Sequence, residues 1–173
     1  MADTTTNYDL PFQLIGDAPD GPDLGQGLAE AVDAELTLLN AKPIITGAAC
    51  SAPLDLTTAE ADVAGATVTV ATTKPNARYV AHGSFYMSAA TGGSAVASGK
   101  LMVDGVAQAA KANFTGPNTL DRASVAQTWR GTLAAAGNHT LKLRGVASAV
   151  GAGNGAFRIN TGDTTITVEV FES

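Results

Sequence analysis

Side chains that could perform acid–base or nucleophilic chemistry are few in this sequence. It contains two histidines, His82 and His139, and one cysteine, Cys50. The two histidines fall in different predicted strands, and for each of them a surface position is favoured over a catalytic role. We therefore interpret both histidines as surface polar residues. Cys50 follows two alanines in an apolar run, so we expect it to be a reduced, buried residue.

Carboxylates are the other candidates for chemistry, as metal ligands. They gather in two predicted loops, with Asp55, Glu60 and Asp62 in one and Asp17, Asp20 and Asp23 in the other. Neither loop has the alternating ligands and central glycine of an EF-hand, so solvated loops are the favoured interpretation over a weak calcium site. The glycine-rich segment 151–156 lacks the third glycine of a dinucleotide fingerprint. We expect no enzyme activity, no cofactor and no metal.

The composition excludes further classes of function. Of 173 residues, 15% are charged, the net charge is −6, and the basic residues are scattered, so no basic surface for nucleic acid is expected. The apolar runs are far shorter than the roughly 20 residues of a membrane span, and residues 1–9 lack the features of a signal peptide. We expect a protein that binds neither nucleic acid nor membrane and is assembled in the cytoplasm.

The organising element is a predicted helix over residues 23–40. Its apolar residues recur at spacings of three and four, which places them on one stripe: Leu24, Leu28, Val32, Leu36 and Leu39. A helix this short is marginal alone in water, so the stripe must be buried either on its own domain or against copies of itself.

Residues 1–22 are predicted to form an extended arm, because Pro11, Pro19 and Pro22 interrupt any regular element. The arm carries large apolar side chains with no core of their own: Tyr8, Leu10, Phe12, Leu14 and Ile15. It could pack back on its own domain or be a disordered terminus. The alternation of these residues favours an extended docking peptide whose side chains enter the pockets of a partner.

Residues 41–173 are predicted to form one antiparallel β-sandwich, most simply a jelly roll. About eight strands alternate apolar and polar residues, and the last, residues 164–172, is expected inside a sheet. Asp104-Gly105 predicts a hairpin between 100–103 and 106–110, and Gly137-Asn138 a second one between 123–133 and 139–145. The few aromatic residues are interpreted as core anchors: Tyr79, Phe85, Trp129 and Phe157.

The arm and helix resemble a segment found on virion proteins of tailed bacteriophages, particularly those infecting actinobacteria. The similar features are the Tyr-x-Leu-Pro start at Tyr8, the Gly-Asp-x-Pro-Asp turn at residues 16–20 and the Ala-Glu-Ala-Val-Asp helix at residues 29–33. The segments LMVDGVAQ, WRGTLAAAGNHTLKLRG and TTITVEVFE are similar to the late strands of trimeric jelly rolls of the tumour-necrosis-factor type.

These resemblances imply a structural protein of the virion. The arm would dock on the major capsid protein, the helix and sandwich would form a homotrimer, and the sandwich would face outward as a capsid decoration or head fibre. The alternative is a tail-fibre adhesin whose sandwich recognises a glycan of the host surface. The chain has no long fibrous repeat between anchor and head, which favours the outer surface of the capsid.

Overall fold

The computed structural model describes residues 3–4, 11–12, 26–33 and 43–172. The chain divides into two compact units, Met1–Lys42 with Ser173 and Pro43–Glu172, and each is described by itself. The second unit begins two residues after the start of the predicted sandwich domain at residue 41.

In the first unit, β1 (Asp3–Thr4) pairs antiparallel with β2 (Pro11–Phe12). Residues 26–33 are helical, in the middle of the predicted helix, and include Leu28 and Val32. Of the predicted arm, Phe12 lies in β2. The remaining residues of the arm and of the helical stripe lie outside the described residues: Tyr8, Leu10, Leu14, Ile15, Leu24, Leu36 and Leu39.

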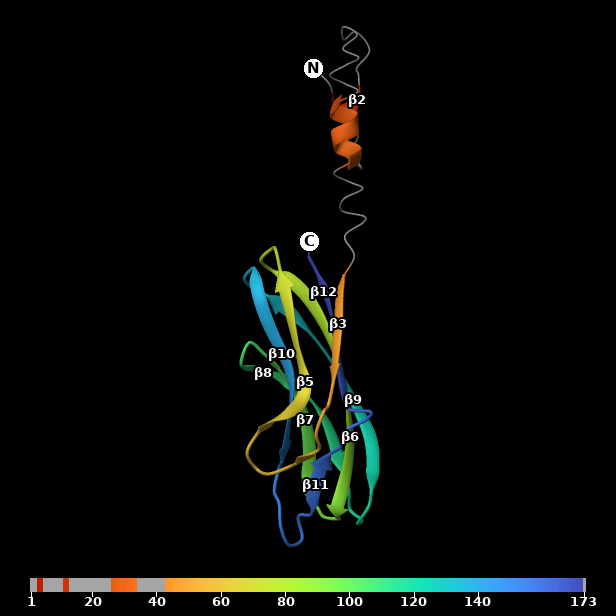
Figure 1. Cartoon of the computed structure of the whole chain (residues 1–173), viewed down its shortest axis with the longest axis vertical. Coiled ribbons are helices and arrows are strands. Elements are labelled where there is room, and N and C mark those ends of the chain that lie inside the picture. Colours follow the sequence, from red (N-terminus) through yellow and green to blue (C-terminus); the bar gives the residue numbers. More distant parts are fainter. Residues whose placement is uncertain (1–2, 5–10, 13–25, 34–42, 173) are drawn as a thin grey trace. The chain divides into compact units, whose positions relative to one another are not determined.

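The second unit is built of antiparallel strands (Figure 1). Short strands β3 (Ile44–Ala49) and β4 (Leu54–Asp55) precede the long β5 (Ala61–Thr72) and β6 (Ala77–Thr91). The others are β7 (Val96–Val103), β8 (Val106–Thr115), β9 (Arg122–Leu133), β10 (Gly137–Ala147), β11 (Ala156–Ile159) and β12 (Thr165–Phe171).

Two sheets pack face to face as a jelly roll. One has the order β5-β10-β7-β8. In the other, the long strand β6 pairs with β9 along one edge and, along its opposite edge, with β12 and then β11. β3 and β4 extend this sheet beyond β12 and β11, so β12 is paired on both sides, as the sequence predicts. The fold class expected from strand alternation is therefore confirmed, with one short helix in the part of the chain described.

One of the two predicted hairpins is present and the other is wrong. β7 and β8 form the Asp104-Gly105 hairpin, with both residues at positive φ (49° and 83°). β9 and β10 do not pair, because β9 lies beside β6 and β10 lies between β5 and β7 in the other sheet. Turn residues at Gly137 indicate that the chain reverses, but only the packed strands decide which sheet receives the next strand.

The inward side chains of both sheets form one core. All four predicted aromatic anchors lie in it, with relative exposures of 3% for Tyr79, 0% for Phe85, 3% for Trp129 and 2% for Phe157. In β7, Gly99 lies directly beneath the ring of Phe85, where a Cβ would approach the ring atoms to 2.5 Å. A glycine is therefore required in that strand for the two sheets to close around Phe85.

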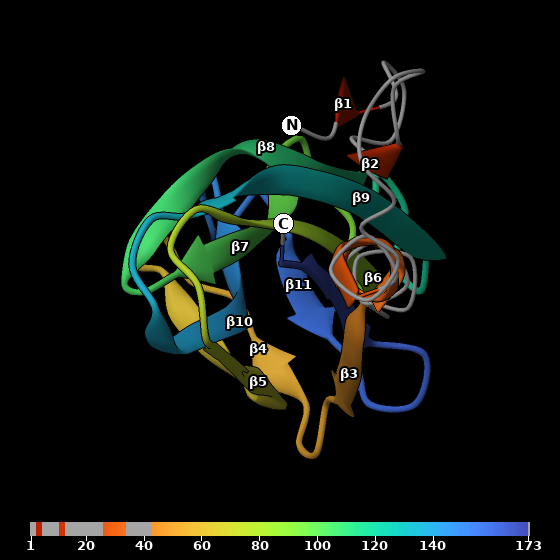
Figure 2. The same ribbon diagram turned by 90° about the horizontal axis from the view of Figure 1, so that it is seen from above.

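Strands β8 and β9 lie side by side where the two sheets meet at one flank (Figure 2). The Trp129 indole in β9 donates a hydrogen bond of 2.8 Å to the Ala110 carbonyl oxygen in β8. This bond links an edge strand of one sheet to an edge strand of the other.

Candidate functional site

The structure separates the three residues capable of nucleophilic or acid–base chemistry. His82 is exposed on the outer face of β6, with Nδ1 2.9 Å from Thr128 Oγ1. Cys50 is 7% exposed, and its Sγ donates to the Ala52 carbonyl oxygen at 3.0 Å. His139 is 7% exposed, so the prediction of a surface position is wrong for this histidine. It points inward from β10 beside the similarly inward Leu141, a direction that strand alternation sets.

His139 connects two loops at one end of the sandwich. Its Nδ1 lies 2.7 Å from Asp104 Oδ2, and its Nε2 lies 3.0 Å from the Ala135 carbonyl oxygen. The hydrogen bond that the His139 ring donates to the Asp104 carboxylate is the main cause that raises the pKa of His139 above its usual 6.5. Burial works to raise the pKa of Asp104, but hydrogen bonds from His139 and from the Thr140 amide more than offset it and lower the pKa below 3.8. The pair is therefore ionic near pH 6.

Because of this pair, we expect the stability of the protein to fall as the pH rises above 6.5. Because the pKa of His139 is raised on folding, its contribution is complete below 6.5 and is lost as the pH rises through the raised pKa. The lowered pKa of Asp104 gives a contribution present above 3.8 and lost as the pH falls through the lowered value. Thermal unfolding midpoints measured on both sides of pH 6.5 check the prediction.

Asp104→Asn is the informative variant, because asparagine tolerates positive φ and still accepts a hydrogen bond from the Thr140 amide. It should flatten the decline in stability above pH 6.5, whereas His82→Gln should leave that decline in place. An unchanged decline in Asp104→Asn would show that other groups cause it.

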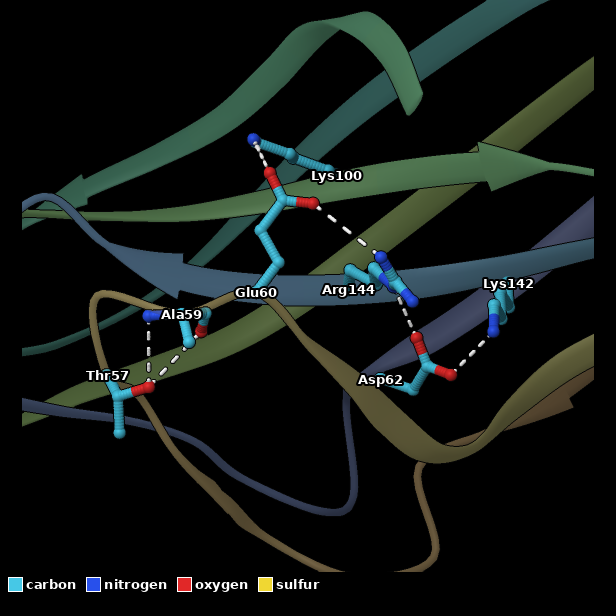
Figure 3. A network of polar contacts seen from close by, with 7 residues as sticks. All are labelled: Thr57, Ala59, Glu60, Asp62, Lys100, Lys142 and Arg144. Atoms are coloured by element: carbon cyan, nitrogen blue, oxygen red, sulfur yellow. Dashed lines mark hydrogen bonds and ion pairs between the residues drawn. The ribbon is translucent and has the colours of Figure 1, made fainter. Parts of the chain in front are cut away.

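The carboxylates predicted to lie in one solvated loop all have cationic partners, and two of them, Asp55 and Asp62, lie on strands. Asp55 in β4 accepts two hydrogen bonds from the Arg158 guanidinium, at 2.6 and 3.1 Å. Glu60 pairs with Lys100 and Arg144, and Asp62 in β5 with Lys142 and Arg144 (Figure 3). Among the described residues, no group of three His, Cys, Asp or Glu side chains has the geometry of a metal site.

The network of Figure 3 joins the start of β5 to β7 and β10 beside a shift in the pairing register of β5 and β10. The pKa of Asp62 is lowered chiefly by the hydrogen bond from Lys142 and further by Arg144, against the opposing effect of burial. Each charge in the network has a partner of opposite sign. The network therefore fixes the strand edge and leaves no charge available for a ligand.

Two arginines on the outer face of the sheet that contains β6 and β9 differ from the paired cations of this network. Arg78 in β6 and Arg130 in β9 are exposed, and neither guanidinium has an ion pair or hydrogen bond within the described part of the chain. They border a hollow of about 310 Å³, which is lined by Arg78, Tyr79, Val80, Arg130, Gly131 and Phe171. Phe171 is half-buried, so part of its ring surface remains accessible.

A second hollow, of about 230 Å³, lies toward the other end of this sheet, where β11 pairs with β6. It is lined by Ser88, Ala89, Ala90, Leu120, Arg122, Arg158 and Asn160. Leu120 is 68% exposed and has a φ of +71°, a conformation that bulky residues rarely adopt. Its amide donates to the Ala89 carbonyl oxygen at 2.9 Å, which holds the loop against β6.

In the helix, Leu28 and Val32 are 43% and 41% exposed. They are four residues apart and therefore lie on one face. On the opposite face, Gln26 Nε2 donates to Glu30 Oε1 at 2.7 Å. The two described members of the predicted apolar stripe thus keep a large accessible surface.

The sequence did not reveal the two hollows. Arg78 and Arg130 are 52 residues apart and come together only through the pairing of Arg78 with Thr132 and of Val80 with Arg130. The alternation of each strand places each arginine on a polar face. No local signal tells which of several strands will lie beside β6.

Comparisons with known proteins identify no family. No family model matches the chain, and no curated protein does. Among solved structures, a chain of infectious bursal disease virus, Gt strain, is similar at 10% identity and a TM-score of 0.44, over 75% of this chain and 33% of that one. The chain thus spans about a third of that neighbour's length.

Two further neighbours are small domains. The CBM36-1 domain of a multidomain xylanase from the hindgut metagenome of Trinervitermes trinervoides is 12% identical, with a TM-score of 0.35, over 75% of this chain and 98% of that one. The C-terminal domain of the sugar-binding protein EclA is 13% identical, with a TM-score of 0.36, over 73% and 79%. The neighbours thus include a virus protein and sugar-associated domains, and at these TM-scores the likeness carries no functional argument.

Proposed function

We propose that this chain is a non-enzymatic structural protein of a tailed-bacteriophage virion, a homotrimer that decorates the outer surface of the capsid. Its arm would bind the major capsid protein and its sandwich would face outward. The observation that carries the proposal is the exposure of Leu28 and Val32 on the helix. These are large aliphatic side chains on one face of an element that needs a partner.

Association of three helices would bury the parts of Leu28 and Val32 that are still exposed. Full burial of an aliphatic side chain stabilises by about 1.5 to 3 kcal/mol, so the exposed two-fifths of Leu28 and Val32 correspond to roughly 1 kcal/mol each. A trimer gathers this contribution from three chains. The same helix carries the resemblance to the virion-protein segment at residues 29–33, which supports the capsid context.

The sandwich offers a surface compatible with close subunit approach. Its outer face contains two cross-strand rows of mostly small side chains, Gly47–Thr167–His82–Thr128 and Ala49–Thr165–Ser84–Ala126. Small outward residues allow the sheets of neighbouring subunits to come near each other. The strands of the two sheets also have the order of a jelly roll, which is the fold of the trimeric proteins that the sequence resembles.

We expect the intact chain to be a trimer by light scattering at micromolar concentration. Leu28→Asp and Val32→Asp, singly and together, should weaken the trimer progressively, because a buried carboxylate without a partner is costly. Gln26→Glu places a carboxylate on the opposite face of the same helix and should leave the mass unchanged. A monomeric intact chain, or a double variant as fully trimeric as the intact chain, would refute the proposed assembly.

The location can be tested by counting copies. Decoration of a capsid requires many copies per virion, whereas a tail fibre requires few. Quantitative mass spectrometry of purified virions, with the major capsid protein as internal standard, separates the two. Electron microscopy of the same virions would show which symmetry position is occupied.

The second candidate function is a tail-fibre adhesin that recognises a host-surface glycan. The hollow beside Leu120 favours it, because a bulky residue at positive φ is a form of strain that gathers at binding sites. The polar groups of Arg122 and Asn160 line the same hollow. A low copy number at the tail would support this function over decoration.

A further inference from the structure

Arg78 and Arg130 form a pair of neighbouring cations, and neither has an acidic partner among the residues that the structure describes. Their strands pair so that Arg78 lies opposite Thr132 and Arg130 opposite Val80, which makes the two arginines diagonal neighbours on one face. Diagonal positions in an antiparallel pair are about 7 to 8 Å apart, within reach of long side chains. The two guanidinium groups can therefore bind one ligand between them.

The surrounding charges do not neutralise this pair. Glu169 is the acidic residue of β12 on the same face; it lies opposite Val80 and makes no ion pair with either arginine. The protein has a net charge of −6, and Lys100, Lys142 and Arg144 all have carboxylate partners. Arg78 and Arg130 differ from these three cations. Because like charges repel, an anion between Arg78 and Arg130 would relieve an unfavourable interaction.

The lining of the hollow restricts the kind of anion. Guanidinium groups bind carboxylates through two parallel hydrogen bonds, which fixes the plane of the acid. Phe171 and Val80 add apolar surface beside the charges. A volume of about 310 Å³ is at the lower end of the range of about 300 to 1,000 Å³ for small-molecule pockets. A compact ligand with an acid group and an apolar ring face fits these properties.

An extended peptide fits less well. β6 and β12 offer no free backbone edge at the hollow, since β6 is paired with β9 and β12, and β12 is paired with β3 and β6. β9 is an edge strand, and its outer edge lies beside β8 near Trp129. A peptide therefore cannot add a strand between Arg78 and Arg130. Recognition must come from the side chains, which suits a ring with a carboxylate better than a chain of peptide groups.

We propose that this hollow binds a carboxylate-bearing sugar, such as a uronic acid residue of an acidic glycan. Arg78 and Arg130 hold the carboxylate, and Phe171 with Val80 contacts the apolar face of the sugar ring. The site does not depend on attachment to a capsid, so the free protein binds as well. A failure of capsid decoration and a failure of this site are therefore separate results.

Isothermal titration of the full-length chain with digalacturonate tests the proposal. The matched probes are a neutral galactose disaccharide, which has the ring without the acid, and triglutamate, which has the acid without the ring. We expect binding of digalacturonate that weakens as salt rises, with binding of both other probes at least tenfold weaker. Equal binding of triglutamate would show simple charge attraction and overturn the proposal.

Two exposed-site variants localise the ligand. Arg78→Gln and Arg130→Gln should each weaken binding about tenfold or more, since each removes a charge-assisted hydrogen bond. Arg130→Lys should restore part of the affinity, because it keeps the charge and loses the two-bond geometry. Glu169→Gln should strengthen binding by removing the nearby competing carboxylate.

Lys111→Gln is the control variant. Lys111 lies in β8 of the other sheet, is likewise an exposed cation on a strand, and lines neither hollow. The control should bind digalacturonate as the unchanged protein does, and thermal unfolding should show that all variants are folded. No binding by the unchanged protein, or a loss in Lys111→Gln equal to that in Arg130→Gln, would overturn the assignment.

Discussion

Replacing Trp129 by alanine should lower the free energy of unfolding by about 3 to 5 kcal/mol, the largest effect expected from a single side chain in the sandwich. The indole is 3% exposed and packs over Gly83, where a Cβ would lie 2.7 Å from Trp129 Cζ3 and 3.1 Å from Leu143 Cδ2. Its removal leaves a cavity between the sheets and also deletes the bond to the Ala110 carbonyl oxygen. Equilibrium unfolding in urea measures the loss.

Two companion variants separate packing from hydrogen bonding. Trp129→Phe keeps most of the ring volume and should cost much less than alanine, since a single net hydrogen bond is worth about 0.5 to 1.5 kcal/mol. Gly83→Ala should cost about 1 to 3 kcal/mol by overpacking in the presence of Trp129, and less in Trp129→Ala, where the methyl group occupies part of the cavity. Additive effects in this double-mutant cycle would contradict the proposed contact between Gly83 and the indole.

Local patterns were sufficient to predict the sandwich and its core. The alternation of Tyr79, Phe85 and Trp129 with polar neighbours defines inward positions without knowledge of the strand order. Asp104-Gly105 gave the β7–β8 hairpin because both positions require positive φ, which aspartate and glycine tolerate. In these cases the determining interaction is within a few residues of sequence.

The two wrong predictions, for the hairpin at Gly137 and for His139, have one physical cause: interactions between residues far apart in the sequence. The hairpin expected at Gly137 was wrong because β9 pairs with β6 instead of with the next strand. Within that pair, Trp129 lies opposite Ala81, 48 residues earlier in the sequence. His139 was expected at the surface, yet Asp104 and the Ala135 carbonyl oxygen satisfy its ring nitrogens inside the fold. A buried polar side chain with its hydrogen bonds satisfied carries no mark in the sequence.

The candidate sites depended even more on tertiary structure. The helix face of Leu28 and Val32 could be derived from spacing alone, and the structure adds their exposure. The arginine pair needs the register of β6 and β9, which no local pattern specifies. Surface sites made of residues from separate strands are therefore the part of this protein that is hardest to predict from its sequence.

Deleting residues 1–22 should abolish attachment to capsids while leaving the rest of the chain folded. The arm carries five large apolar residues in a segment interrupted by prolines: Tyr8, Leu10, Phe12, Leu14 and Ile15. The buried cluster of the second unit runs from Cys50 to Val170, so it lies wholly within the truncated chain. The truncated protein should therefore keep the thermal unfolding of the sandwich, and it retains residues 23–40 for assembly.

Avidity should strengthen the attachment of a trimer through its three arms. Burying several aromatic and aliphatic groups on a capsid would stabilise by several kcal/mol per chain, even after the cost of ordering an extended segment. In a trimer, the binding of one arm raises the effective concentration of the other two, so three weak contacts make one firm attachment. Loss of all three arms should leave no measurable binding.

The measurement is co-sedimentation with capsids that lack this protein, using intact and truncated chains at equal concentration. Phe12→Asp in the intact chain should weaken attachment strongly. Gln13→Asp adds the same charge at the next position, on the other side of an extended segment, and should weaken it far less. If the truncated chain decorates capsids as fully as the intact one, the attachment surface lies in the sandwich or the helix; if Phe12→Asp and Gln13→Asp behave alike, the arm attaches without the alternating pockets inferred from its sequence.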